Sequence, residues 1–420
     1  EMTKVLETYD VEEVAFPLLF PESLLKKEKD HVSGFAPEVL LIERIGHKKF
    51  KDPLVIRPTS ETLFGVYFKQ TLNSYKQLPV KLNQWVNILR WENNTRPFLR
   101  NSEFYWQEGH TIHGEITEAK DFSLKIISFY KQFVNEMLLL PVIYGEKTSS
   151  ERFAGAINTY TIETVLKDGQ ALQSGTSHYL GNNFTKAFDV RVLGKNNQMF
   201  NPYQTSWGIS TRLIGALIMT HSDNKGLILP SKISPYHFVI LTVNADKNPQ
   251  VKKLATELKI KFSKFRSKID DSDKGIGFKA QEWETKGIPI RIEIGPKDLI
   301  KKQVTIIIRT DDKKQFVLIS KLNEKFIENL LTTNDQKIYQ EAKKLKEQKI
   351  KEVTNIEDLI DVVDNGFFAK GYWIEDSQFE KKLKTKNGIT VRCLVEQKNE
   401  GTCLSTGKKT LTIAYFARAY

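Results

Sequence analysis

Two strand-like runs separated by a short polar segment dominate residues 80–110. The first, VKLNQWVNILRWE (80–92), is rich in β-branched and aromatic residues, and EFYWQEGH (103–110) resumes that pattern. The segment between them, NNTRPFLRN, is punctuated by Asn, Thr and Pro, which favour a loop. Two strands joined by roughly eight to ten loop residues predict an antiparallel hairpin. This part of the chain is therefore expected to form an antiparallel sheet.

The predicted hairpin carries an unusual mixture of side chains. Because side chains alternate across a strand, residues two apart share a face. The residues grouped in this way are Arg90 with Glu92 on the first strand, and Phe104, Trp106, Glu108 and His110 on the second. A guanidinium pairs with carboxylate or phosphate, and a carboxylate accepts an ammonium, so one cavity lined by these groups would suit an amino acid beside a nucleotide. Arg96 and Arg100 could reach outward to phosphates, although an exposed hairpin with surface ion pairs remains the alternative.

Two other stretches share this polar character, and a third, apolar stretch holds a single arginine. RPTSET (57–62) places Thr59 and Glu61 two residues apart, and QSGTSHYLGNNF (173–184) holds a single histidine, His178. A lone histidine is more often structural or exposed than catalytic. SWGISTRLIGALIMTHSD (206–223) is interpreted as a helix with Ser206 as its N-cap. An arginine in such an apolar helix, Arg212, is costly to bury without an anion, unless it points to solvent.

The sequence contains no glycine-rich phosphate loop. Neither a Walker motif nor a GxGxxG motif after a strand is present. If a nucleotide binds, arginines on β-structure are therefore expected to hold it.

The chain is long enough for several domains, and its charge is unevenly distributed. Its 420 residues predict two or three domains. Strands predicted at 236–243, 288–294 and 304–309 alternate with helices at 247–265 and 322–331, as in a small α/β domain. Residues 241–350 hold 25 lysines and arginines against 16 carboxylates, a net charge of +9. Such a block attracts a polyanion such as nucleic acid, unless it is merely a solvated lysine-rich surface. A lysine-rich helix predicted at 334–353 then leads into a third region.

Several broad classes of protein are disfavoured. Two cysteines, Cys393 and Cys403, exclude a disulfide scaffold and suit a reducing cytoplasm. No apolar run reaches the roughly 20 residues that a membrane span needs. The first ten residues, EMTKVLETYD, do not have the pattern of a signal peptide. Because position 1 is not Met, residues upstream of it are expected.

The motifs together resemble a known family. RPTSET, RWE followed by PFLR and EFYWQEGH, QSGTSHYLG and SWGISTRLIG, in that order, are similar to prolyl-tRNA synthetases of the eukaryotic and archaeal type, which are class II enzymes. The resemblance implies an α+β catalytic domain (1–231) with an antiparallel sheet and flanking helices. It further implies an α/β anticodon-binding domain (232–330) and a small α+β C-terminal domain (331–420). The region around Pro17 resembles motif 1, which implies a homodimer.

The resemblance also implies roles for individual residues. Arg90 and Arg212 would be the catalytic residues. The residues implied for ATP binding are Arg90, Glu92, Arg100, Asn101, Gln173, Thr176, Ser210 and Arg212. Those implied for proline binding are Thr59, Glu61, Arg90, Phe104, Trp106, Glu108, His110, His178, Ser206 and Trp207. Glu284, Arg291 and Lys297 match positions that would contact the anticodon. Asn101 departs from the family, which usually has Thr there.

The implied activity joins L-proline to tRNA(Pro) through prolyl-adenylate, with ATP as the second substrate. Mg²⁺ would enter with ATP near Gln173, without a ligand from the protein. Many relatives have a four-cysteine zinc site, but GYWIEDSQF (371–379) lacks Cys and Ser405 stands where a ligand would be, so no zinc is expected. Residues 111–205 are too few for the large editing insertion of the bacterial branch. A synthetase for another small amino acid such as threonine, or an inactive paralogue that binds tRNA, is the competing hypothesis.

The chain ends in ARAY, which resembles the C-terminus of the family. Tyr420 would either dock near the active site or form a frayed end. The resemblance does not distinguish these two outcomes.

Overall fold

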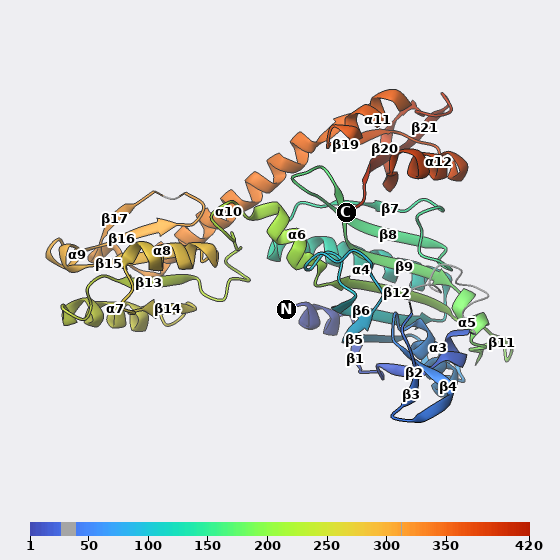
Figure 1. The fold of residues 1–420 in the computed structure, drawn as a ribbon. Helices are drawn as coiled ribbons and strands as arrows, with labels where there is room; N and C mark the ends of the chain where they lie inside the picture. The colour runs from blue at the N-terminus through green and yellow to red at the C-terminus, as the bar shows by residue number, and fades with distance from the viewer. Residues whose placement is uncertain (27–38, 312) are drawn as a thin grey trace. The chain divides into compact units, whose positions relative to one another are not determined.

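The computed structural model describes residues 1–26, 39–311 and 313–420, and the chain divides into two compact units (Figure 1). The first unit contains Glu1–Phe133, Val142–Ala216 and Lys349–Tyr420. The second contains Val134–Pro141 and Leu217–Gln348. In the described part of the chain, no helix is long and apolar enough to span a membrane.

A mixed, mainly antiparallel sheet organises the first unit. Among the described residues it has eleven strands, in the order β1–β5–β6–β12–β9–β8–β7–β20–β21–β19–β18. Their bounds, in that order, are Glu12–Glu13, Val80–Leu89, Glu103–His113, Tyr203–Ser210, Ala171–Gly181, Asn158–Val165, Ile143–Glu146, Ile389–Thr402, Lys409–Arg418, Phe368–Tyr372 and Ile350–Glu352. The predicted hairpin is confirmed, because β5 and β6 pair antiparallel from Val80↔Ile112 to Leu89↔Glu103. Strand β5 ends at Leu89, so Arg90 and Glu92 lie in the connection rather than on the strand.

Two smaller sheets and a set of helices complete this unit. The sheets pair β2 (Leu19–Pro21) and β3 (Leu41–Ile45) with β4 (Lys48–Ile56), and β10 (Val192–Leu193) with β11 (Met199–Phe200). The helices are α1 (Met2–Glu7), α2 (Glu22–Lys26), α3 (Glu61–Thr71), the 3₁₀ turn η2 (Tyr75–Gln77), α4 (Ile116–Met137), α5 (Asn183–Ala187), α6 (Arg212–His221), α11 (Ile356–Asp364) and α12 (Ser377–Asn387). Of these, α4 and α6 continue into the second unit.

The prediction of a helix over 206–223 with Ser206 as its N-cap is wrong. Tyr203–Ser210 is strand β12, and the helix begins only at Arg212. The strand pairs with β6 on one side and with β9 on the other. The segment does carry a strand signal that the prediction missed, because Tyr203, Thr205, Trp207 and Ile209 alternate with Gln204, Ser206, Gly208 and Ser210.

Helix α4 packs on one face of the sheet through aromatic side chains. The ring of Trp207 lies 6.4 Å from the rings of both Phe122 and Tyr130 of α4, measured between centroids. A Cβ at Gly109 would come within 2.1 Å of this indole, so only glycine fits beside it. Since α4 covers this face, the opposite face of the central strands is available for a site.

The C-terminal segment extends the sheet of the first unit. Strand β20 joins β7 through the pair Leu394↔Glu146. The backbone oxygen of Leu394 would lie 2.3 Å from a Cβ at Gly145, so glycine permits this close approach. The buried carboxylate of Glu163, in β8, also binds Lys147 at 2.7 Å and Arg392 of β20 at 2.9 Å. The C-terminal segment is thus fixed to the strands that carry the cavity described below.

The second unit is built on a sheet of five strands within its described residues, in the order β14–β13–β15–β16–β17. Their bounds, in that order, are Ser267–Asp270, Phe238–Thr242, Ile290–Ile294, Gln303–Ile308 and Gln315–Leu318. Its helices are α7 (Pro249–Lys261), α8 (Ile276–Thr285), α9 (Pro296–Ile300), the 3₁₀ turn η3 (Ile319–Lys321) and α10 (Glu324–Lys349), whose last residue belongs to the first unit. The predicted alternation of strands and helices is confirmed.

The two helices predicted at 322–331 and 334–353 form one helix, α10. Thr332 and Thr333 do not interrupt it, because their hydroxyls donate to the carbonyls of Glu328 and Asn329 one turn earlier. The domain boundary expected between residues 330 and 331 therefore falls inside a continuous helix.

Candidate active site

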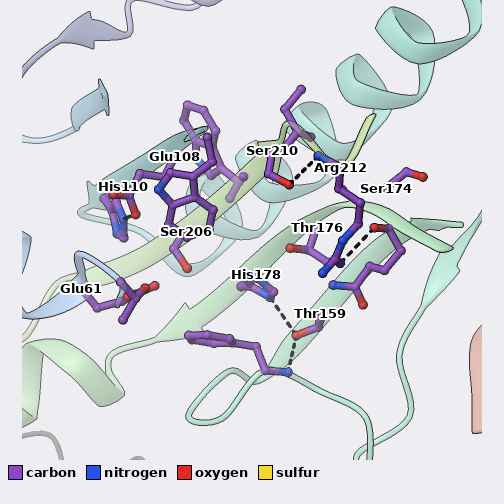
Figure 2. A pocket seen from close by; sticks show the side chains of 18 of the residues that line it. Glu61, Glu108, His110, Thr159, Ser174, Thr176, His178, Ser206, Ser210 and Arg212 are labelled. Carbon is purple, nitrogen blue, oxygen red and sulfur yellow. Dashed lines mark hydrogen bonds and ion pairs between the residues drawn. The ribbon is translucent and has the colours of Figure 1, made fainter. Parts of the chain in front are cut away.

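A cavity of about 210 Å³ opens on the face of the sheet opposite α4 (Figure 2). Strand register explains its lining, because residues directly opposite one another share a face. Ser206 of β12 lies opposite His110 of β6 and His178 of β9, and Gly208 lies opposite Glu108 and Thr176. The lining residues are Thr59, Glu61, Arg90, Phe104, Trp106, Glu108, His110, Glu151, Arg152, Phe153, Thr159, Gln173, Ser174, Gly175, Thr176, His178, Ser206, Trp207, Gly208, Ile209, Ser210 and Arg212.

One end of the cavity holds buried carboxylates. Glu108 accepts hydrogen bonds from Gln84 Nε2 at 2.7 Å and from the hydroxyl of Ser60, and it contacts His110 Nε2 at 3.1 Å. Nearby, the hydroxyl of Thr59 donates to Glu61. Burial alone would raise the pKa of Glu108, but the contacts from His110, Ser60 and Gln84 outweigh it and hold that pKa below its ordinary value. This end therefore presents a negative charge suited to a cation.

Aromatic rings line the middle of the cavity. The Arg90 guanidinium lies 5.9 Å from the ring centroid of Phe104 and 5.5 Å from that of Trp106, and its Nε donates to the Pro58 carbonyl at 2.9 Å. The indole Nε1 of Trp106 and the hydroxyl of Ser206 are buried and have no hydrogen-bond partner among the described residues. A buried polar group without a partner is costly, so these atoms favour a ligand with polar groups here.

The imidazole of His178 also lines the cavity. Its Nδ1 is hydrogen-bonded to the hydroxyl of Thr159 at 3.0 Å, and Phe153 stacks on its ring with centroids 4.5 Å apart. Burial, aided by the charge of His110, lowers the pKa of His178 to about 3. The ring is therefore neutral at physiological pH and acts as a hydrogen-bonding and packing group rather than as a cation.

The other end of the cavity holds Arg212, the first residue of α6 (Figure 2). Its Nε donates to the Leu99 carbonyl at 3.2 Å and its Nη1 to the Gln173 carbonyl at 3.4 Å. Burial lowers its pKa to about 10, and the charges of Arg100 and Arg90 add to this effect. No carboxylate within the described ranges forms an ion pair with it at 4.0 Å or less. A half-buried cation near other cations, without a paired anion, favours binding of an anionic ligand.

Three of the residues expected to bind ATP lie outside the lining. Glu92 and Arg100 form an ion pair at 3.3 Å, and Asn101 is exposed. Arg100 also donates to the backbone oxygen of Tyr420 at 2.6 Å. The C-terminal residue is thus docked beside this arginine, and the ring of Tyr420 lies 4.8 Å from the guanidinium of Arg96.

The residues expected to bind the substrate proline lie at the carboxylate end and in the middle of the cavity, with one exception. Trp207 belongs to the lining, but its indole packs on α4, on the other face of the sheet. Alternation explains this position, because its neighbours Ser206 and Gly208 face the cavity.

Sequence analysis missed several residues that contribute to the site. Gln84 and Ser60 bind Glu108, although neither belongs to the expected set. Gln84 could have been identified, since it is the polar residue on a strand face otherwise formed by Val80, Leu82, Val86 and Ile88, and a buried glutamine requires a partner. The sequence gives no indication of Phe153, Arg152 and Glu151. They lie in the segment between β7 and β8, where no strand or helix periodicity predicts which side chains face the cavity.

In the second unit, the residues expected to contact the anticodon are only partly together. Arg291 lies 3.7 Å from Glu284 and donates to Glu293 at 3.0 Å. Lys297 is exposed in α9, beyond the C-terminal end of β15.

The structure describes no cluster of three or more His, Cys, Asp or Glu residues that could hold a metal ion within residues 1–26, 39–311 and 313–420. Cys393 and Cys403 are both buried and unpaired. The Cys403 thiol instead accepts a hydrogen bond from the Ile374 amide at 3.2 Å and contacts the Ser405 hydroxyl at 3.5 Å.

Comparison with known proteins places the chain in a family. Residues 44–221 match the tRNA synthetase class II core domain (G, H, P, S and T), residues 237–329 the anticodon binding domain, and residues 356–420 the C-terminal domain of prolyl-tRNA synthetase. A proline–tRNA ligase of Mycoplasma mobile is 48% identical over 423 residues, covering 99% of this chain and 88% of the relative. That of Mycoplasma mycoides subsp. mycoides is 46% identical over 414 residues, covering 98% and 87%.

The chain belongs to the prolyl-tRNA synthetase family. It is therefore a class II aminoacyl-tRNA synthetase, as the order of the motifs predicted. A crystal structure of prolyl-tRNA synthetase from Cryptosporidium parvum, complexed with halofuginone and AMPPNP, superposes with a TM-score of 0.94 at 34% identity. The match covers 100% of this chain and 89% of that one. The expected fold class, an antiparallel catalytic sheet followed by anticodon-binding and C-terminal domains, is confirmed.

Proposed function

We propose that this chain is a proline–tRNA ligase. It activates L-proline with ATP to prolyl-adenylate and then transfers the prolyl group to the 3′ end of tRNA(Pro). One observation carries the proposal: a single cavity holds an ionised, buried carboxylate, Glu108, at one end and an arginine without a paired anion, Arg212, at the other.

Proline would bind at the carboxylate end. Its ammonium would lie against Glu108, whose charge is stabilised by Gln84 and Ser60, and its ring would pack between Trp106 and His178. The other residues proposed for this site are Thr59, Glu61, Arg90, Phe104, His110 and Ser206, with Trp207 supporting them from the opposite face of the sheet. The proline carboxylate would then point toward Arg90, between the two ends of the cavity.

ATP would bind at the arginine end. Arg90 would contact its α-phosphate, and Arg212 with Arg100 would hold the γ-phosphate of a bent nucleotide. Gln173, Thr176 and Ser210 would lie along the nucleotide. Glu92 would accept the adenine amino group, beside Asn101. The ion pair between Glu92 and Arg100 at 3.3 Å supports this arrangement, since the pair fixes the Glu92 carboxylate before the nucleotide binds.

The chemistry needs positioning and charge neutralisation more than acid–base groups. The proline carboxylate is already a nucleophile at neutral pH, and it attacks the α-phosphorus while the bond to pyrophosphate breaks. Arg90 and Arg212 would stabilise the charge that moves onto the phosphate oxygens. His178, neutral because of its lowered pKa, is not required to move a proton.

Magnesium would have to come with the phosphates. Each carboxylate of the lining already has a partner. Glu61 accepts a hydrogen bond from Thr59, Glu108 accepts one from Gln84, and Glu151 pairs with Lys384. They therefore do not form a protein-held ion site, and Mg²⁺ would lie near Gln173 without protein ligands. No step above depends on it.

The remaining parts of the proposal follow from the family. Glu284, Arg291 and Lys297 would contact the anticodon of tRNA(Pro), for which arginine hydrogen bonds to guanine are suited. The enzyme would act as a cytoplasmic homodimer, without structural zinc and without a cis editing domain.

Amino-acid-dependent exchange of pyrophosphate into ATP tests this function. Exchange with proline alone supports it. Exchange with threonine alone would indicate a synthetase of different specificity, and exchange with no amino acid would indicate an inactive paralogue that binds tRNA.

A further inference from the structure

We propose that Glu380, in the C-terminal segment, is a positioning residue for the proline end of the cavity. This inference rests on the function proposed above. It starts from the segment 147–157 between β7 and β8, which we call the pocket loop. Its residues Glu151, Arg152 and Phe153 line the cavity. The strand register does not fix this loop, so other contacts must hold it in place.

The first part of the pocket loop, residues 148–151, is held by α12 and the residues just before it. Glu380, on the first turn of that helix, is buried and accepts hydrogen bonds from Thr148 Oγ1 at 2.8 Å, from the hydroxyl of Ser150, and from Trp373 Nε1 at 3.0 Å. Trp373 holds the carboxylate within the C-terminal segment, whereas Thr148 and Ser150 would lose this buried acceptor if the loop moved.

Two exposed contacts reinforce this attachment at its edge. Lys384, one turn further along α12, pairs with Glu151 at 2.9 Å. Glu375, just before α12, accepts a hydrogen bond from the backbone amide of Ser149. Exposed ion pairs contribute little to stability, so the buried Glu380 is expected to carry most of the effect.

The loop transmits this position to the proline end. Three residues beyond Ser150, the backbone amide of Phe153 donates to Thr159 Oγ1 at 3.1 Å, and Thr159 binds His178. The Phe153 ring also stacks on the imidazole of His178. A shift of the loop would therefore open the wall against which the proline ring is expected to pack, and leave the arginine end in place.

The kinetic consequence is a selective loss of proline affinity. Glu380→Gln replaces the acceptor with an amide whose NH₂ group must face either Trp373 Nε1 or the hydroxyls of both Thr148 and Ser150. We expect the KM for proline in pyrophosphate exchange to rise about tenfold, which equals about 1.4 kcal/mol, while kcat and the KM for ATP change less than about twofold. Asp364→Asn is the matched control. It lies in the same segment and breaks the exposed pair with Arg418 but does not touch the pocket loop.

A double variant separates positioning from general destabilisation. If Glu380 acts through Phe153, then Glu380→Gln should raise the KM for proline no further in a Phe153→Ala background. Additive effects of the two substitutions, equal effects on the two substrates, or an unchanged KM for proline in Glu380→Gln would each overturn the inference. Absence of proline-dependent exchange in the unmodified enzyme would instead refute the proposed function.

Discussion

Arg212 is expected to stabilise ligand binding at the expense of the fold. Its pKa falls to about 10, well below the ordinary value for arginine, chiefly through burial. At neutral pH the side chain is charged in both the folded and the unfolded chain. The lowered pKa therefore means that folding must bury the charge, at a cost of about 3 kcal/mol. Replacement by Met keeps an unbranched, though shorter, side chain and removes this cost.

Arg212→Met is thus expected to have opposite effects on stability and activity. The loss of hydrogen bonds to the Leu99 and Gln173 carbonyls offsets part of the gain, so the free energy of unfolding should rise by about 1–3 kcal/mol. Pyrophosphate exchange should fall about 10²–10³-fold, because an electrostatic contact to the reacting phosphates is lost. Urea denaturation followed by tryptophan fluorescence, without ligand, measures the first effect, and exchange at saturating proline measures the second.

Arg392→Met is the matched control. Arg392 is also buried, but two of its nitrogens bind Glu163, at 3.2 and 2.9 Å. Removing it leaves Glu163 with Lys147 as its remaining charged partner, and should destabilise the chain by about 3 kcal/mol or more. If Arg212→Met were destabilised as strongly as Arg392→Met, or if it retained near-normal exchange, Arg212 would be a structural residue and the reasoning would be refuted.

Three further outcomes are expected. Glu108→Gln should raise the KM for proline at least about thirtyfold with little change in the KM for ATP, because a buried charge pair is lost; equal effects on both substrates in steady-state exchange would contradict this. Arg291→Ala should impair tRNA charging and spare exchange, and a parallel fall in both assays would argue against its anticodon role. The pKa of His178, about 3 in the fold against 6.5 ordinarily, means that the unfolded chain binds an extra proton as pH falls below 6.5. His178 should therefore lower the free energy of unfolding by about 2 kcal/mol between pH 6.5 and 5. In urea titrations at these two pH values, the free energy of unfolding should fall less in His178→Gln than in the unmodified chain. Equal decreases would show that His178 is not the group that titrates.

Local sequence patterns were sufficient to predict site residues where a regular strand lines the cavity. The alternation of Phe104, Trp106, Glu108 and His110 placed four residues on the cavity face, and the hairpin pairing of β5 and β6 confirmed the expected geometry. The same alternation misled at Glu92, because β5 ends at Leu89 and the connection follows its own course.

Other features depend on contacts between distant segments. Strand β12 pairs with β6 on one edge and β9 on the other, and the extent of this pairing could not be predicted from the local sequence. The pocket loop contains no motif, and Phe153 reaches the cavity because residues more than two hundred positions later hold the loop. Such positions cannot be predicted from periodicity, since the determining partner lies outside any local window.

A crystal structure of the chain with a non-hydrolysable prolyl-adenylate analogue tests the central claim most directly. The prolyl ammonium is expected about 3 Å from the Glu108 carboxylate, with the ring against Trp106 and the phosphate mimic beside Arg90. An analogue bound outside this cavity, or bound in it with the adenine at Glu108, would contradict the assignment of its two ends.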